Sequence, residues 1–302
     1  MLEELREAQH QQGDMNELTP VPYKSTLPRE RKPTRVLVKL YKKQQAKIDE
    51  AENQKQVFDV VDHPNVIKCL DAGLVEFKAT NYTYFVFPAY QADLFVVLSK
   101  TGRLPEPIAR YYLKQLVAGL QAIQDKGFAH RNLKPKNLYI DAQDNYNLKI
   151  ADFVFASHLN ENSKTFVGTI DYMSPEIHLK LAHEPGKADV FAVGVILFNM
   201  ITGQAPFQKA TREDKNYPTL IEDTTAFWKQ VCGTLLPEIS SLTPEFKSLI
   251  EFCLRLEPTE RPFVDQFQFS AWTRGHTATK EEVFEEMTMR FKSLNLKYPN
   301  NS

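Results

Sequence analysis

Apolar and polar residues alternate in the first third of the chain, and the spacing becomes helical after it. The stretch RVLVKLY (35–41) is rich in β-branched residues and alternates, which predicts a strand. The following stretch, 43–61, consists mostly of helix-forming residues with spaced apolar positions, which predicts a helix. HPNVIKCLDAG (63–73) and YTYFVFPAY (82–90) predict further strands.

Helical patterns dominate after Asp93. Residues 106–126 keep a helical apolar period, and Gly127 follows at the position of a C-cap. NLYI (137–140) and NLKIA (147–151) predict a short hairpin, and Asp189 opens a helix that is almost wholly apolar. Strands followed by helices predict an α+β fold with a small β-rich lobe and a larger helical lobe.

The last helical pattern covers residues 277–294. Thr279 and Glu282 have the spacing of a capping box at its start. One apolar stripe runs along it, made of Phe284, Met287, Phe291 and Leu294. We expect this helix to pack on the rest of the domain, and a helix that binds a partner protein is the alternative.

Composition narrows the class of protein. The chain has 302 residues, of which 42% are hydrophobic and 25% charged, and its net charge of -1 gives no basic field for nucleic acid or an anionic membrane. Its three cysteines are far apart, which favours a reducing compartment. The polar first 18 residues are no signal peptide, and the apolar run 190–201 is too short to cross a bilayer. We therefore expect a soluble, cytoplasmic protein.

Seven motifs occur in one order: VLVK with Lys39, DHPNVIK, HRNLKPKN, ADF, GTIDYMSPE, KADVFAVGVILFNMITGQAPF and RPF. In this order they resemble the eukaryotic protein kinase family, serine/threonine type, over roughly residues 35–272. The resemblance implies a bilobal kinase fold. Its parts would be an arm or degenerate first strands (1–34), a small lobe (35–90), a large lobe (91–272) and a helical tail (273–302).

The resemblance implies ATP and magnesium as ligands, and it assigns residues to them. Lys39 matches the lysine that holds the nucleotide phosphates, while Asn137 and Asp152 match the two metal ligands. Lys134 matches a lysine typical of serine/threonine kinases, and Leu138 is a further candidate for contact with the nucleotide. Taken singly, Lys39 would be an ordinary strand lysine, and Asn137 and Asp152 would be turn residues. The common order of the motifs supports their match to the kinase positions, but it does not show that the protein is active.

Asn132 stands where the family has its catalytic aspartate. That carboxylate orients the substrate hydroxyl and takes its proton, whereas an amide is no useful base. Loss of a positioned base commonly costs about 10²–10⁴-fold in rate. This substitution alone would leave a feeble enzyme.

Other positions around the nucleotide also depart from the family. Gly13 is the only glycine before Lys39, so the phosphate-covering glycine loop is missing. Gln54 stands where a glutamate would pair with Lys39, unless a shifted helix brings Glu50 or Glu52 there.

Two further departures concern the nucleotide pocket and the ADF motif. Leu37 adds bulk where the family has an alanine over the adenine. Val154 replaces a glycine, and we expect it to fix its segment in one conformation that turns Asp152 away from the site.

The framework residues of the family are retained. The resemblance implies that Glu176 pairs with Arg261 inside the helical lobe and that Asp189 holds the loop around His130. The segment between Asp152 and Glu176 resembles an activation loop containing Ser163, Thr165 and Thr169. In the family Arg131 would meet a phosphate on this loop, placed on Thr165 by an upstream kinase, and Thr169 would contact position 132 and Lys134. A solvated hydroxyl-rich loop is the alternative.

The sequence thus favours a catalytically inactive protein with a kinase fold, which binds other proteins as a scaffold or allosteric module. A weak serine/threonine kinase that tolerates Asn132 is the alternative. An intermediate would bind nucleotide through Lys39 and Asp152 without turnover.

Overall fold

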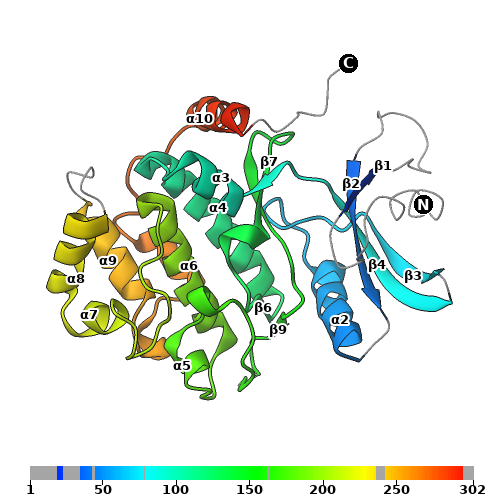
Figure 1. Cartoon of the computed structure of the whole chain (residues 1–302), viewed down its shortest axis with the longest axis horizontal. Coiled ribbons are helices and arrows are strands. Elements are labelled where there is room, and N and C mark those ends of the chain that lie inside the picture. Colours follow the sequence, from blue (N-terminus) through cyan, green and yellow to red (C-terminus); the bar gives the residue numbers. More distant parts are fainter. Residues whose placement is uncertain are drawn as a thin grey trace.

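The computed structural model describes residues 19–22, 35–42, 45–77, 79–161, 163–235 and 242–294. These residues form a smaller lobe built on a β-sheet and a larger helical lobe (Figure 1). The predicted bilobal α+β fold is confirmed.

In its described residues, the small lobe has a four-stranded antiparallel sheet, in the order β1-β2-β4-β3, and one helix. Its elements are β1 (Thr19–Pro22), β2 (Arg35–Lys42), α2 (Gln45–Val60), β3 (Asp71–Phe77) and β4 (Thr80–Pro88). β2 and α2 lie within two residues of the predicted strand and helix. In the register of β2 and β4, Lys39 lies opposite Phe85, and Leu37 lies opposite Phe87.

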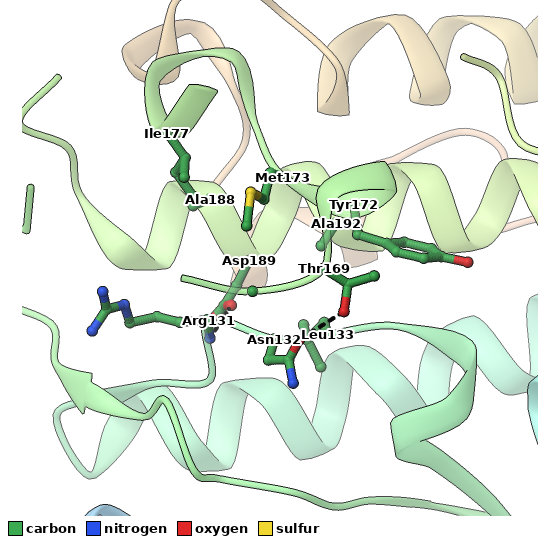
Figure 2. Close-up of a pocket in the computed structure, with 11 residues that line it drawn as sticks. Arg131, Asn132, Leu133, Thr169, Tyr172, Met173, Ile177, Ala188, Asp189 and Ala192 are labelled. Carbon is green, nitrogen blue, oxygen red and sulfur yellow. Dashed lines mark hydrogen bonds between the residues drawn. The ribbon is translucent and has the colours of Figure 1, made fainter. Parts of the chain in front are cut away.

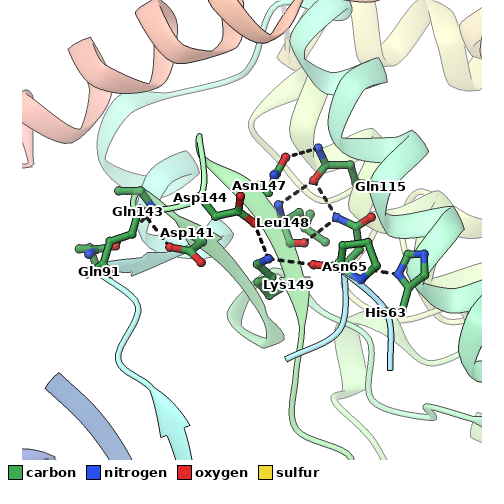
Figure 3. Close-up of polar contacts among 12 residues, drawn as sticks. His63, Asn65, Gln91, Gln115, Asp141, Gln143, Asp144, Asn147, Leu148 and Lys149 are labelled. Atoms are coloured by element: carbon green, nitrogen blue, oxygen red, sulfur yellow. Dashed lines mark hydrogen bonds and ion pairs between the residues drawn. The ribbon is translucent and has the colours of Figure 1, made fainter. Parts of the chain in front are cut away.

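The predicted strand over HPNVIKCLDAG is wrong for most of its length, because β3 begins only at Asp71. Residues 63–70 form a loop that docks on the large lobe (Figure 3). The Asn65 amide donates to the Leu148 carbonyl at 2.9 Å and to Gln115 Oε1 at 3.0 Å. Val66 forms a single parallel bridge with Ile150 of β8, so the apolar pattern of this stretch reflects burial between the lobes more than continuous strand pairing.

The large lobe contains the predicted hairpin and a set of helices. Its elements as far as the central helix are β5 (Ala92–Asp93), α3 (Leu94–Thr101), α4 (Glu106–Asp125), β6 (Phe128–Ala129), η1 (Pro135–Asn137), β7 (Leu138–Asp141), β8 (Asn147–Ile150), β9 (Ser157–His158), η2 (Ile170–Tyr172) and α5 (Pro175–His178). Then follow α6 (Pro185–Thr202), α7 (Tyr217–Glu222), α8 (Thr224–Gln230), η3 (Val231–Leu235), α9 (Pro244–Cys253), η4 (Pro258–Glu260), η5 (Val264–Phe269) and α10 (Lys280–Ser293). β7 and β8 pair as an antiparallel hairpin, as predicted. Gly127 has φ 83° just after α4, where a side chain would be strained.

Helix α6 is the core of the large lobe and crosses its centre (Figure 1). It begins at Pro185, one turn before the predicted start at Asp189. It is long and apolar enough to cross a membrane by length and composition, but 89% of it is buried within the domain. Its apolar surface is thus fully used by packing against neighbouring elements.

Helix α10 packs on the large lobe, and its predicted capping box is present. Thr279 Oγ1 accepts from the Glu282 backbone, and the Glu282 carboxylate accepts from the Thr279 backbone. The buried stripe consists of Val283, Met287 and Phe291. Phe284, which we placed in the stripe, is 48% exposed because it lies at the rim of the interface.

A buried ion pair braces the large lobe. The guanidinium of Arg261 donates through Nη1 and Nη2 to the two carboxylate oxygens of Glu176, each at 2.7 Å. Burial opposes ionisation of Glu176, but the hydrogen bonds and charge of Arg261 outweigh it and lower the pKa of this carboxyl. The two residues are 85 positions apart, so the pair joins distant parts of the lobe.

We expect Glu176→Gln to lower the free energy of unfolding by about 3–5 kcal/mol, because it leaves the buried Arg261 charge uncompensated. Urea denaturation measures this loss. Glu260→Gln, at an exposed residue beside Arg261, is the matched control and should change the free energy by less than about 0.5 kcal/mol. Equal effects of the two variants would contradict a bracing role.

Candidate functional site

The candidate site lies where the two lobes meet. Residues 130–137 connect β6 to η1 in the large lobe, and Asp152 follows β8 there, while Lys39 projects from β2 of the small lobe. Arg131 and Asp152 have φ 64° and 71°, which are unusual for residues with side chains. Such backbone conformations persist only where surrounding contacts hold them.

Lys39 forms an ion pair with Asp152 across this junction. Its ammonium donates to Asp152 Oδ1 at 2.6 Å, and both side chains are about a quarter exposed, at 25% and 26%. Burial raises the pKa of Asp152, but the charge and hydrogen bond of Lys39 reverse this and leave the pKa below its ordinary value. Asp152 is therefore an ionised acceptor held by a protein cation.

Gln54 does not take the place of a carboxylate partner for Lys39. Its side chain is 1% exposed and donates to the Tyr41 hydroxyl at 2.6 Å. Glu50 pairs with Lys47, and Glu52 is exposed on α2. The alternative in which one of these glutamates reaches Lys39 is thus not seen in the part of the chain that the structure describes.

Asn132 lies within a directed chain of hydrogen bonds. The Lys134 ammonium donates to Thr169 Oγ1 at 2.8 Å, and this hydroxyl donates to Asn132 Oδ1 at 3.1 Å. The Asn132 Nδ2 group then faces Asp152 Oδ2 at 3.4 Å. The Thr169 hydroxyl accepts a hydrogen bond from Lys134, so its own O–H donates to Asn132. The Asn132 amide must therefore present its oxygen to Thr169 and its Nδ2 group to Asp152.

The expectation that Val154 turns Asp152 away from the site is wrong. Asp152 itself adopts the left-handed conformation, which aims its carboxylate at Lys39 and Asn132. Val154 is buried without a positive φ, and its carbonyl accepts from the Asn53 side chain at 2.9 Å. The β-branched residue is accommodated because the unusual backbone angle falls two residues earlier.

Buried polar contacts hold the loop from inside the large lobe. The two Asp189 oxygens accept from the backbone N–H groups of His130 and Arg131, each at 2.7 Å. Burial raises the pKa of Asp189 to about 7, against the opposing effect of these two donors. Asn137 Nδ2 donates to the Asn132 carbonyl at 2.8 Å. Residues retained from the family thus set the backbone path of the loop.

Arg131 contacts the hydroxyl groups of the predicted activation loop. Its Nη2 donates to Ser163 Oγ at 2.9 Å and to Thr165 Oγ1 at 2.5 Å. Ser163 also pairs with His183 through two backbone hydrogen bonds of 3.2 and 3.0 Å. The structure thus brings Arg131 and Thr165 together as the resemblance implied.

The nucleotide-facing residues are only partly described. Leu37 is half-buried and packs against the main core, and Leu138 is fully buried. The region of the missing glycine loop lies largely outside the described residues, so its conformation stays untested. The sequence itself contains no glycine between Gly13 and Lys39.

The residues assigned to magnesium do not present a ready site for it. Both Asp152 oxygens face protein donors, Lys39 at 2.6 Å and Asn132 at 3.4 Å. The Asn137 Nδ2 group is bound to the Asn132 carbonyl, and within the described ranges no group of three or more His, Cys, Asp or Glu side chains has the geometry of a metal site. Asp152 therefore already has protein donors where a metal ion would need its oxygens.

A small cavity of about 20 Å³ lies on the large-lobe side of Asn132, enough for about one water molecule. Figure 2 shows Asn132 and Thr169 joined by a hydrogen bond at its wall, with Tyr172 and Met173 nearby and Arg131 extending away. Apolar side chains form much of its wall, so it is a packing gap beside the loop and not a cleft for a substrate.

Sequence reasoning missed three partners in the site: Tyr41, Asn53 and the direct contact of Ser163 with Arg131. Strand alternation could have found Tyr41, because it lies two residues after Lys39 and shares its face of the sheet. Asn53 carries no signal, since its partner is a backbone carbonyl 101 positions away.

The fold and the site define a protein kinase domain. The protein kinase domain family matches residues 28–273 of the chain. The serine/threonine-protein kinase ATG1a of Arabidopsis thaliana is 32% identical over 256 residues, which cover 78% of this chain and 39% of that protein. CBL-interacting protein kinase 11 of Oryza sativa subsp. japonica is 30% identical over 234 residues, covering 75% and 43% of the two chains.

The chain therefore belongs to the protein kinase family and is similar to serine/threonine kinases. It spans less than half the length of either relative. ATP and magnesium are the ligands that this family generally uses.

The tautomer of His130 makes stability depend on pH. Nε2 donates to the Ala151 carbonyl at 2.9 Å, and Nδ1 accepts from the Asn132 backbone at 3.2 Å, which requires a neutral ring. Burial lowers the pKa of His130 from 6.5 to about 4. Between these values the unfolded chain binds a proton that the folded chain does not, so acidification lowers stability.

We expect the difference in unfolding free energy between wild type and His130→Phe to shrink on acidification, by about 1.2 kcal/mol between about pH 6 and 5. Urea denaturation at each pH measures it. Asp189 has the opposite pH dependence, but it is present in both proteins and cancels in the difference. Parallel pH profiles would show that His130 does not titrate in this way.

Proposed function

We propose that this protein is a catalytically inactive member of the kinase family and works as a scaffold or allosteric module that binds other proteins. One observation carries the proposal. Asn132 stands at the position of the catalytic base, and its amide donates toward Asp152 Oδ2 at 3.4 Å. An amide in this role accepts no proton from a substrate hydroxyl. The residue works as a hydrogen-bonding spacer in a loop that moves no proton.

The electrostatics of the site supports the same proposal. An aspartate at position 132 would place a second carboxylate about as close to Asp152 as the present amide. Two neighbouring carboxylates repel each other unless a cation or a proton separates them. Asn132 removes this repulsion and makes a cation unnecessary, which is the reverse of what phosphoryl transfer requires.

A weak serine/threonine kinase is the second candidate, and the retained Lys39, Lys134 and Asn137 favour it. Nucleotide binding without turnover would use the same lysine. Against both, Leu37 adds bulk above the adenine position, and the chain has no glycine-rich loop to cover phosphates.

We expect purified protein to transfer no phosphate from Mg-ATP to a generic protein substrate above the level of Lys39→Ala. Asn132→Asp should produce no gain in rate, because the chain would still lack the glycine loop and a carboxylate at position 54. Radiolabel transfer measures both, and the thermal midpoint with Mg-ATP tests binding in wild type and in Leu37→Ala. Transfer that disappears in Lys39→Ala would establish the weak kinase instead.

A second part of the proposal concerns Arg131 and Thr165, which form a contact suited to regulation of binding. Phosphorylation of Thr165 by an upstream kinase would add charge and acceptor oxygens beside a guanidinium that already touches this hydroxyl. The segment would then be ordered for a partner protein without any catalysis. Ser163 shares the same guanidinium and would keep the geometry.

We expect protein carrying phosphothreonine at position 165 to resist proteolysis within residues 160–170 about tenfold better than unmodified protein, since a charged hydrogen bond adds about 1.5–3 kcal/mol. Limited proteolysis with mass spectrometry measures the rate. The protection should vanish in Arg131→Ala and persist in Lys164→Ala, a neighbouring exposed cation. Equal protection in both variants would show that Arg131 is not the receptor.

A further inference from the structure

Three consecutive residues at the lobe junction, 152–154, are each held by a side chain of the small lobe. Lys39 contacts Asp152 at 2.6 Å, the Phe58 ring lies 5.4 Å from the Phe153 ring, and Asn53 donates to the Val154 carbonyl at 2.9 Å. Phe153 is fully buried and also lies 5.0 Å from the His130 ring. The small lobe thus contacts this segment through one ion pair, one aromatic contact and one amide hydrogen bond.

A second attachment fixes the C-terminal end of α2. The loop that follows this helix runs along the edge of the large lobe (Figure 3). Lys149 Nζ donates to the Pro64 carbonyl at 2.8 Å, and the backbone of Ile150 donates to the Asn65 carbonyl at 2.8 Å. Since α2 itself carries Asn53 and Phe58, both the helix and the loop that follows it contact the large lobe.

The charges at the junction balance without a metal ion. The kinase pattern places carboxylates at the positions of Gln54 and Asn132, and two amides there remove two negative charges. That change equals the charge of one divalent cation. The remaining carboxylate, Asp152, is matched by the Lys39 ammonium and by the amide donor of Asn132. A polar network whose groups are matched in this way rigidifies its surroundings.

We propose that Lys39 replaces a divalent metal ion as the counter-charge of Asp152, and that with Asn53 and Phe58 it latches the two lobes together in the absence of nucleotide and metal. Magnesium is thereby excluded from Asp152 in the resting protein. This inference rests on the proposed function, because a kinase that turns over Mg-ATP needs Asp152 for the metal.

A double-mutant cycle on Lys39→Met and Asp152→Asn tests the latch. Each single variant leaves one charge of the junction without its partner, so each should lower the thermal midpoint by about 2–4 °C. The thermal midpoint of the double variant should be no lower than that of the less stable single variant, because both substitutions remove the same contact. Additive losses would overturn the proposal.

The exposed pair Lys55 and Asp59 on α2 supplies the matched control, with side chains 63% and 55% exposed. The cycle on Lys55→Met and Asp59→Asn should show shifts below about 2 °C. Wild-type protein should also have the same midpoint in chelator and in millimolar magnesium chloride. A midpoint that rises with magnesium alone would overturn the proposal, whatever the result of the activity assay.

Amide hydrogen exchange gives a readout that does not depend on the charged variants folding. Asn53→Ala should speed exchange in α2 and in residues 152–156, because it removes the amide contact to the Val154 carbonyl. Glu52→Ala, at the exposed neighbouring position, should leave both segments as in wild type. Unchanged exchange in Asn53→Ala, or equal changes in both variants, would overturn the latch.

Discussion

The ionised carboxylate of Asp152 must be neutralised at the place where the two lobes meet, and much of the site follows from this constraint. A partly buried carboxylate is costly unless an opposite charge or several donors satisfy it. Lys39 supplies the charge from the small lobe, and Asn132 supplies a donor from the large one. The order Lys134, Thr169, Asn132 then has only one consistent direction of hydrogen bonding, toward Asp152.

The large lobe provides a rigid frame for this arrangement. Asp189, buried near the N-terminal end of α6, fixes the loop backbone, and the Glu176–Arg261 pair fixes the segment on its other side. Each carboxylate is saturated by donors that do not depend on a ligand. The contacts that keep the fold are therefore separate from those that a phosphoryl transfer needs.

The sequence predicted those elements whose pattern is local. β2, α2, α4 and the capping box of α10 follow from alternation, helical spacing and end signals, and all four are confirmed. Residues 63–70 looked like a strand because burial against the other lobe leaves the same apolar signature. The direction of the Asp152 side chain depends on one unusual φ and on the contact with Lys39, 113 positions away, which no window of sequence contains.

The departures from the kinase pattern are physically linked and not independent losses. Restoring a carboxylate at position 132 alone would set it against Asp152, while restoring one at position 54 alone would bury a further negative charge beside the Tyr41 hydroxyl. Either single reversal disturbs a balanced junction, so each substitution makes the other easier to keep. Under the proposed function, a site that lacks two carboxylates is thus harder to return to catalysis than a site that lacks one, and the protein acts through the fixed geometry of its surfaces.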